Sequence, residues 1–439
     1  MVLIRHFPPK CRWHTVIWWL GCGGIEMAVT VVADGVDRAA VWRAVTRGGA
    51  AMVAAMGVGR FAFTPILPMM HDQAGMSTQT GALLATGNYL GYFVGALAVA
   101  VAPRLLTARM VWRVALVALI ATLAAMPLSH SGIAWFVLRT ITGVASALIM
   151  VMAIHAAGVA AGGRKVLTGW AFGGVGVGIA ASGVLVLALS HGSWESTWVG
   201  CAVLGVVCVV YAWPLVGGAV DPMPARATTQ TTSDDLARHA PLEPSEGHTA
   251  PESNSPAPVD DSRTRSRKFA ALMTSYSLQG VGYIIAGTFL VAAVQRTAPA
   301  EIGNAAWILV GLAAFPSTVL WTHLAHRHSP AWLLIAALLA QAVGMALPAL
   351  MGGMVAALIS AVLFGATFMG IVALAAGIGG NLRGPRALAV LTTGYAVGQV
   401  VGPLLAAPLL HSGYRSALLL GSGLVVLAAI AALGARDRR

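Results

Sequence analysis

The sequence predicts an all-α integral membrane protein, with twelve transmembrane helices in two pseudo-symmetric six-helix bundles. Of its 439 residues, 58% are hydrophobic and only 10% are charged, whereas soluble proteins carry about a quarter charged residues. Long apolar runs recur along the chain, and a weak internal repeat relates its two halves. A soluble domain so poor in charge could not cover its surface, which excludes water-soluble enzymes and ordinary nucleic-acid binders.

The apolar runs predict the individual helices, because a hydrocarbon core about 30 Å thick takes roughly twenty helical residues to cross. The expected spans cover residues 45–69, 80–101, 110–128, 131–157, 166–190, 195–217, 268–294, 301–323, 331–350, 353–379, 387–410 and 415–434.

The basic residues predict the orientation. If the first span begins inside, twenty of the 27 lysines and arginines fall on the cytoplasmic side and two, Arg296 and Arg415, on the outer side. Cytoplasmic loops carry such an excess of basic residues. We therefore expect a multi-pass protein of the plasma membrane, the bacterial cell inner membrane, with both termini cytoplasmic.

Composition separates the two bundles. Residues 218–267 hold seven of the 21 prolines and eight of the 15 acidic residues, with few large apolar side chains, which predicts a disordered cytoplasmic linker. The N-terminal bundle then covers residues 44–217. Residues 268–439 form the C-terminal bundle and a short tail.

Residues 1–43 form an N-terminal extension that conflicts with the charge pattern. A helix over Thr15–Ala33 would place Arg5, Lys10 and Arg12 on the outer face, against the rule that favours basic residues inside. We therefore expect translation of upstream sequence, with a native start near Met27.

The two halves repeat at an offset near 223 to 225 residues. The triplet Gly57-Val58-Gly59 aligns with Gly280-Val281-Gly282, and Gly169-Trp170-Ala171-Phe172-Gly173 aligns with Gly394-Tyr395-Ala396-Val397-Gly398. Two similar six-helix halves are typical of secondary transporters.

Several motifs resemble one branch of a known family. The run Gly57-Val58-Gly59-Arg60-Phe61-Ala62-Phe63-Thr64-Pro65-Ile66-Leu67-Pro68 is similar to the first-helix signature of the YbfB/YjiJ-type branch of the major facilitator superfamily. Asn88-Tyr89-Leu90-Gly91-Tyr92 and Gly280-Val281-Gly282-Tyr283-Ile284-Ile285 also resemble that branch. The likeness covers about residues 45–434 and implies a twelve-helix transporter of the major facilitator fold. It names no cargo.

Two further comparisons with the superfamily concern charged residues. Arg139 with Gly143 resembles its fourth-helix Arg-x-x-x-Gly motif, and the resemblance implies a role for this arginine in substrate or proton handling. The loop after the second helix departs from the superfamily pattern, because it keeps Arg104, Arg109 and Arg113 but lacks the aspartate.

Arg60 and Arg139 are the two charged residues that fall deep inside expected spans, away from the span ends. At 1.5 Å per helical residue, Arg60 lies roughly 22 Å from the cytoplasmic end of its helix and Arg139 roughly 12 Å from the outer end of its own. A buried cation costs at least about 3 kcal/mol by insertion scales and marks a functional site. No acidic residue falls within the interior of a span, and Asp72, Glu195 and Glu301 lie at outer ends.

Two interpretations of these arginines stay open. In the first, they bind an anionic ligand, because a guanidinium matches the oxygens of a carboxylate or phosphate. In the second, Arg60 anchors helix packing by capping carbonyls freed by Pro65 and Pro68, and Arg139 is a gate residue.

Polar residues on other spans complete the expected substrate site. Asn88 and Tyr92 lie four residues apart on one helix face, and Gln279 and Tyr283 repeat that spacing. We expect these four, with Gln399, to orient a substrate that Arg60 and Arg139 bind.

Glycines and prolines are expected to shape the helices around that site. Gly57, Gly59, Pro65 and Pro68 are expected to break the first helix beside Arg60. The remaining candidates for helix packing or gating are Gly143, Gly173, Gly394, Gly398 and Gly402. Small residues every fourth position let helix backbones approach closely.

Other chemistry is not predicted. The glycines at 174, 176 and 178 lie inside an apolar helix and form no nucleotide loop, and no Gly-Lys-Ser/Thr motif is present. His323, His326 and His328 are expected in a solvated loop rather than at a metal. We expect no cofactor, no metal site and no enzymatic activity.

Three function classes remain: movement of a small organic anion by alternating access, proton-linked efflux of drugs or other mixed compounds, and a non-transporting sensor. The lack of acidic residues in the spans disfavours efflux, because cationic-drug sites and proton relays usually recruit Asp or Glu. A sensor would need an output domain. We expect a secondary active transporter whose partners are a small-molecule substrate and the lipid bilayer, with a proton as candidate coupling ion. No oligomeric state is predicted.

Overall fold

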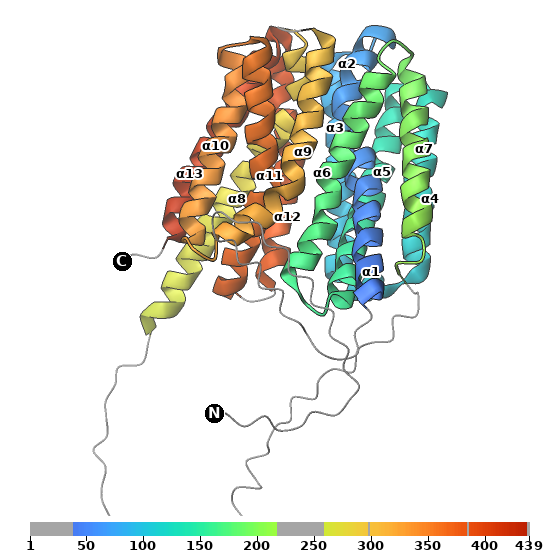
Figure 1. The fold of residues 1–439 in the computed structure, drawn as a ribbon. Coiled ribbons are helices and arrows are strands. Elements are labelled where there is room, and N and C mark those ends of the chain that lie inside the picture. Colours follow the sequence, from blue (N-terminus) through green and yellow to red (C-terminus); the bar gives the residue numbers. More distant parts are fainter. Residues whose placement is uncertain (1–37, 217–258, 297–298, 384–385, 437–439) are drawn as a thin grey trace, which may run out of the picture. The chain divides into compact units, whose positions relative to one another are not determined.

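The computed structural model describes residues 38–216, 259–296, 299–383 and 386–436, which are almost entirely helical and contain no strand. Twelve helices in this part are long and apolar enough to cross a membrane, and each coincides with an expected span. Figure 1 shows them as long rods running alongside one another. Most of the expected N-terminal extension and linker, residues 1–37 and 218–258, lies outside the described residues.

The N-terminal half, called the N-half below, consists of α1 (Arg38–Met52), η1 (Val53–Phe61), α2 (Phe63–Gln73), α3 (Thr78–Val101), α4 (Arg109–Ala125), α5 (Gly132–Ala160), α6 (Lys165–Ala188) and α7 (Trp194–Ala212). The C-terminal half, or C-half, consists of α8 (Val259–Val294), α9 (Ala300–Leu324), α10 (Pro330–Leu350), α11 (Gly353–Arg383), α12 (Arg386–Ala406) and α13 (Tyr414–Ala432). Short 3-10 turns flank these helices: η2 (Pro103–Thr107), η3 (Met126–Leu128), η4 (Ala407–Ser412) and η5 (Leu433–Ala435). The words inner and outer below refer to the ends predicted to face the cytoplasm and the outside.

Two helices start earlier than the apolar runs suggested. The first span begins at Arg38 rather than residue 45, and α8 begins at Val259, so residues 259–267 of the expected linker are helical. Arg263, Arg265 and Arg267 are exposed in this part of α8. A hydropathy window marks only the part of a helix that lipid surrounds, and the backbone hydrogen bonds continue beyond it.

The packing of the helices repeats between the halves. In the N-half α3 packs on α5, α1 on α6 and α4 on α7. In the C-half the corresponding helices pack in the same way, α9 on α11, α8 on α12 and α10 on α13. Contacts between the halves repeat too, because α6 packs on α9 and α3 on α12. This equivalence of helix pairs is the pseudo-symmetry that the internal repeat predicted.

The first span is not a uniform α-helix. Its middle, η1, is π-helical, and all nine of its residues are buried. In a π-helix the N–H of one residue bonds the carbonyl five residues earlier, and such segments occur frequently at functional sites. Helix α2 follows at once and carries Pro65 and Pro68. The expected break therefore takes the form of a change in helix type that keeps the chain helical through the core.

Candidate functional site

Arg60 lies in η1 and is only 2% exposed. Its Nη2 donates a 2.6 Å hydrogen bond to Oε1 of Gln399 in α12, on the other half. The guanidinium carbon lies 4.0 Å from the ring centroid of Tyr92 and 4.8 Å from that of Tyr89, both on α3. Nε of Arg60 has no hydrogen-bond partner. The cation is therefore held by one neutral amide oxygen and by aromatic faces, which attract cations electrostatically.

Arg139 of α5 hydrogen-bonds the backbone of η1. Its Nη1 donates to the carbonyl oxygen of Gly59 at 2.8 Å, and its Nη2 to that of Arg60 at 3.2 Å. In a π-helix the carbonyl of residue 60 would receive the N–H of residue 65, but Pro65 has none. Arg139 donates to this carbonyl instead of the N–H that Pro65 lacks. Arg139, and not Arg60, therefore caps a carbonyl beside Pro65.

Two more side chains fix this part of the N-half. The Ser146 hydroxyl of α5 donates to the carbonyl of Ala55 in η1 at 2.8 Å. Asn88 Nδ2 on α3 donates to the carbonyl of Arg139 at 3.0 Å, while its Oδ1 has no partner. Of the predicted pair on α3, Tyr92 contacts the Arg60 guanidinium, whereas Asn88 bonds the backbone carbonyl of Arg139.

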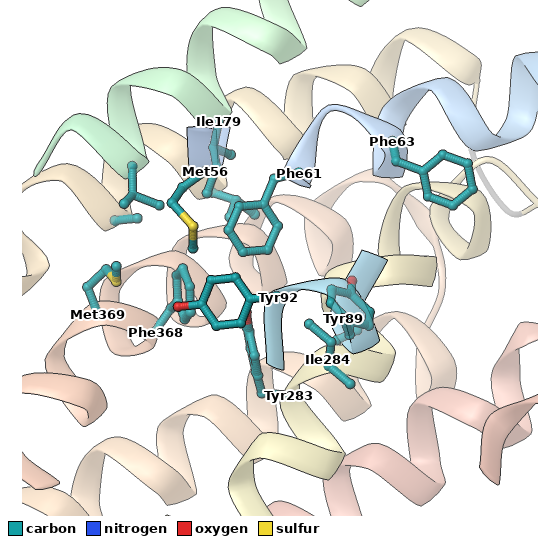
Figure 2. Packing of buried hydrophobic residues seen from close by; sticks show 14 of the residues in the cluster. Met56, Phe61, Phe63, Tyr89, Tyr92, Ile179, Tyr283, Ile284, Phe368 and Met369 are labelled. Carbon is teal, nitrogen blue, oxygen red and sulfur yellow. The ribbon is translucent and has the colours of Figure 1, made fainter. Parts of the chain in front are cut away.

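The two predicted residues on α8, Gln279 and Tyr283, also have different contacts. Gln279 Nε2 donates to Oε1 of Gln341 in α10 at 3.0 Å, so Gln279 joins two helices within the C-half. Tyr283 lies in a group of parallel rings with Phe368 at 4.8 Å and Tyr395 at 5.8 Å between centroids. Figure 2 shows Tyr283 with Phe368 and Tyr92 near the middle of the buried cluster.

Several contacts tie the halves together toward the outer end. The Thr64 hydroxyl of α2 donates to the carbonyl of Gly287 in α8. The hydroxyls of Tyr89 and Thr288 lie 3.0 Å apart, and Gln79 bonds His411. Like the Arg60 contact to Gln399, each of these joins one half to the other.

The outer ends of α2 and α8 also meet around a pocket of about 300 Å³ that contains Asp72, Ala292 and Arg296. Arg296 and Arg415, the two basic residues expected outside, both line a second pocket of about 630 Å³.

The predicted glycines lie at close helix contacts, with different neighbours. Gly57 packs against Gly178 of α6, and Gly143 against the carbonyl of Asn88 on α3. A Cβ at Gly59 would meet side chains of α4 and α5, and Gly394, Gly398 and Gly402 face α8. Gly173 instead faces Phe315 of α9, in the other half. The aligned positions 173 and 398 therefore have different partners.

The charges of the two arginines have no opposite charge nearby. The acidic side chains that the structure describes, Asp72, Glu195 and Glu301, all lie at the ends of spans. Within the described part of the chain neither Arg60 nor Arg139 forms a salt bridge. Arg139 has two backbone carbonyls as compensation, whereas Arg60 has one amide oxygen.

The sequence interpretation missed most of the aromatic residues around Arg60. Phe61, Tyr276, Phe364 and Phe368 were not among the candidates, and Tyr89 and Tyr395 were noted without a role. A signal was available, because the chain has only seven tyrosines and six of them lie within expected spans. Five of these six are buried, namely Tyr89, Tyr92, Tyr276, Tyr283 and Tyr395, and Tyr89 and Tyr92 contact this arginine.

Twelve spans in two halves with equivalent helix pairs, and a buried polar cluster between the halves, define the architecture of major facilitator superfamily transporters. A family model described as "Uncharacterised MFS-type transporter YbfB" matches residues 52–243 and 239–433. The chain belongs to this family. It is a multi-pass membrane transporter and not an enzyme, as the sequence predicted.

Solved structures support the fold. The nucleoside transporter NupG superposes with a TM-score of 0.63 at 15% identity, covering 91% of this chain and 99% of its own. A point mutant of NupG gives a TM-score of 0.65 at 15% identity, covering 90% of this chain and 100% of its own. No curated protein sequence matches the chain significantly.

Proposed function

We propose that this chain is a secondary active transporter that moves a small organic anion by alternating access, with Arg60 as the primary contact to the anion. The observation that carries the proposal is the electrostatic state of Arg60. Its guanidinium is buried between the two halves, and its hydrogen-bond partner is a neutral amide. A buried cation without a counter-charge is costly, and an anionic substrate would supply that charge.

The geometry of the free donors supports a carboxylate or phosphate as the anion. Nε and Nη2 lie on the same edge of the guanidinium and together form a fork for two oxygens. In Arg60, Nη2 bonds Gln399 and Nε is unpartnered. An anion that displaced the amide oxygen of Gln399 would engage both atoms and exchange a neutral acceptor for a charged one.

Arg139 has a positioning role in this proposal. Its two donors bond the carbonyls of Gly59 and Arg60 and so hold the π-helical segment that presents the Arg60 side chain. We therefore place Arg60, Tyr92 and Gln399 at the substrate, with Arg139 and Asn88 behind them.

The contacts between the halves support alternating access. Those formed by Thr64, Gln79 and Tyr89 lie at the level of Arg60 or toward the outer end. We propose that this state is closed to the outside and that rocking the two halves breaks these contacts. The proposal also places the protein in the bacterial inner membrane, with both termini cytoplasmic.

Thermal unfolding of the purified protein tests the anion site, because a ligand that binds the native state stabilises it. The probes are acetate, succinate, benzoate and glycerol phosphate, with tetraphenylphosphonium as a cationic drug-like compound. We expect an anion to stabilise the wild type. The Arg60→Gln variant should bind it about 10- to 150-fold more weakly, as expected for loss of a charged hydrogen bond.

Arg113→Gln is the matched control, because Arg113 also contacts an aromatic ring, that of Trp213, but lies away from the cluster. It should bind anions like the wild type. Stabilisation by tetraphenylphosphonium alone would favour the efflux alternative. Equal anion binding by Arg60→Gln and wild type would refute the proposed site.

A further inference from the structure

Five of the seven tyrosines in the chain are buried on the three helices α3, α8 and α12, and two of the five contact Arg60. Tyr89 and Tyr92 of α3 place their ring faces on the guanidinium. Tyr276 and Tyr283 of α8 and Tyr395 of α12 belong to the C-half. Gln399, which bonds Arg60, lies on α12 four residues after Tyr395. Arg60 therefore lies between the tyrosines of α3 and a helix that carries one of the C-half tyrosines.

The C-half rings are stacked in parallel. Centroids of Tyr276 and Tyr395 lie 4.6 Å apart with planes at 15°, and those of Tyr283 and Tyr395 lie 5.8 Å apart at 17°. Phe368 continues the stack 4.8 Å from Tyr283 at 14°, and Phe364 lies 5.9 Å from Tyr283 at 16°. These rings form one set of nearly parallel faces, which we call the aromatic stack.

This arrangement differs from aromatic packing elsewhere in the chain. In the N-half, Trp194 meets Trp135 edge-on at 85° and His130 at 89°. Edge-to-face pairs fill space between helices, whereas parallel rings offer flat faces that another planar ring can join. Phe61, beside Arg60, meets Phe368 edge-on at 5.8 Å and so links the cation to the stack.

The residue type also bears on the role of the stack. A tyrosine hydroxyl buried in a membrane interior costs free energy unless it is hydrogen-bonded. Phenylalanine or leucine would fill the same space without that cost. The Tyr283 and Tyr395 hydroxyls serve each other as hydrogen-bonding partners, so it is the parallel ring faces and the cation beside them that favour a ligand.

We propose that the anion bound by Arg60 is an aromatic carboxylate, with its carboxylate on the guanidinium and its planar ring against the aromatic stack. This inference rests on the function proposed above and narrows it to one substrate class. The carboxylate takes Nε and Nη2 of Arg60 in place of Gln399. The ring then lies against tyrosine faces of the C-half, so one ligand contacts both halves.

Binding of three matched compounds tests the inference: benzoate, cyclohexanecarboxylate and benzamide. Benzoate and cyclohexanecarboxylate share the charge but differ in the ring, and benzamide keeps the ring without the charge. We expect wild-type protein to bind benzoate about 2- to 12-fold more tightly than cyclohexanecarboxylate, the range of one aromatic pair. Benzamide should bind far more weakly than either acid.

Variants of the stack separate ring stacking from general packing. Tyr283→Leu should remove the preference for benzoate and leave the affinity for cyclohexanecarboxylate unchanged. Tyr283→Phe keeps the ring face and should keep the preference, so it remains informative if the leucine variant does not fold. Tyr211→Leu is the control, because Tyr211 lies outside the stack and bonds Thr46.

The outcomes distinguish the two proposals. If both acids bind equally through Arg60, or if another carboxylate binds through Arg60 and benzoate does not, the aromatic inference is wrong and the anion site stands. If no carboxylate or phosphate binds, or if Arg60→Gln leaves binding intact, the proposed function fails and the inference with it.

Discussion

The two buried arginines have different surroundings, although the sequence presents them alike. Arg139 bonds two backbone carbonyls, and Arg60 bonds one side-chain amide and lies against aromatic rings. Removal of Arg139 takes two hydrogen bonds from buried carbonyls, and a hydrogen bond to a charged group contributes about 1.5–3 kcal/mol. Replacement of Arg60 by a neutral residue takes away a buried charge and breaks no side-chain hydrogen bond to the backbone.

The effect of glutamine at each position on thermal stability follows from this difference. We expect Arg139→Gln to lower the unfolding temperature clearly, and Arg60→Gln to leave it unchanged or raise it, because a glutamine at position 60 can still bond Gln399. Fluorescence-detected unfolding of the two purified variants measures this. Equal destabilisation by both substitutions would contradict the assigned roles.

Charge in an apolar run made the buried position of both arginines predictable. Which of them bonds backbone carbonyls and which bonds a side chain was not predictable, because that depends on how the helices pack around them. Asn88 and Gln279 were selected for helix-face spacing, and spacing does not tell whether a polar side chain meets a backbone carbonyl or a ligand.

At the scale of the helices, close contact between α3 and α5 positions the N-half side of the site. A Cβ at Gly143 of α5 would collide with the carbonyl of Asn88, and a Cβ at Gly91 of α3 with the carbonyl of Thr140. These two glycines let the backbones touch, and the same stretch of α3 carries Tyr89 and Tyr92 to Arg60.

Alanine at Gly143 should therefore separate α3 from α5. We expect Gly143→Ala to weaken anion binding at least several-fold and to lower the unfolding temperature, because backbone atoms cannot move aside as a flexible side chain can. Gly377→Ala is the control: Gly377 lies in α11 with no atom within 4 Å of an added Cβ. Alanine favours the helix by up to about 1 kcal/mol, so the control should be stable and active. Wild-type binding by Gly143→Ala would show that the contact is not needed.

The helices themselves were largely predictable, because hydropathy and length identify each span. The early starts of the first span and of α8 were not, since charged helical turns beyond the lipid leave no apolar pattern. The π-helical segment was predicted only as a break, from its glycines and prolines.

For the whole molecule, alternating access as proposed above would make the contacts between the halves control the balance between its conformations. The hydroxyl of Thr288 on α8 lies 3.0 Å from that of Tyr89 on α3. Loss of one such hydrogen bond costs about 0.5–1.5 kcal/mol. If it forms only in the outer-closed state, its loss shifts the population toward the outer-open state about 2- to 12-fold.

Thr288→Val should therefore expose the outer end. We propose to label a cysteine at Ala292, which lines the pocket between α2 and α8, in a background without the native cysteines. Labelling should become about 2- to 12-fold faster with Thr288→Val. Thr86→Val is the control, because the Thr86 hydroxyl bonds only within its own helix. Equal rates for both variants would contradict the proposed closure.

The division into two halves was predictable from the repeat and from the composition of the linker. The sequence did not predict which helices meet between the halves, namely α6 with α9 and α3 with α12. Every span is apolar all round, so hydropathy does not distinguish a face that meets protein from a face that meets lipid. Family membership and the shared fold show a transporter, and the cargo proposed for it rests on the residues around Arg60.

The π-helical segment has a consequence for comparing this protein with its relatives. A π-turn holds one residue more than an α-turn, and one residue corresponds to about 100° of rotation around a helix axis. Residues after Phe61 are therefore rotated relative to the α-helical pattern of residues 38–52. A helical wheel drawn through the whole span assigns Thr64 and the rest of α2 to the wrong side. Wheels drawn separately on either side of η1 recover the face that meets the C-half. In this span, the number of residues in the π-helical segment therefore determines which side chains face the C-half as much as their identity does.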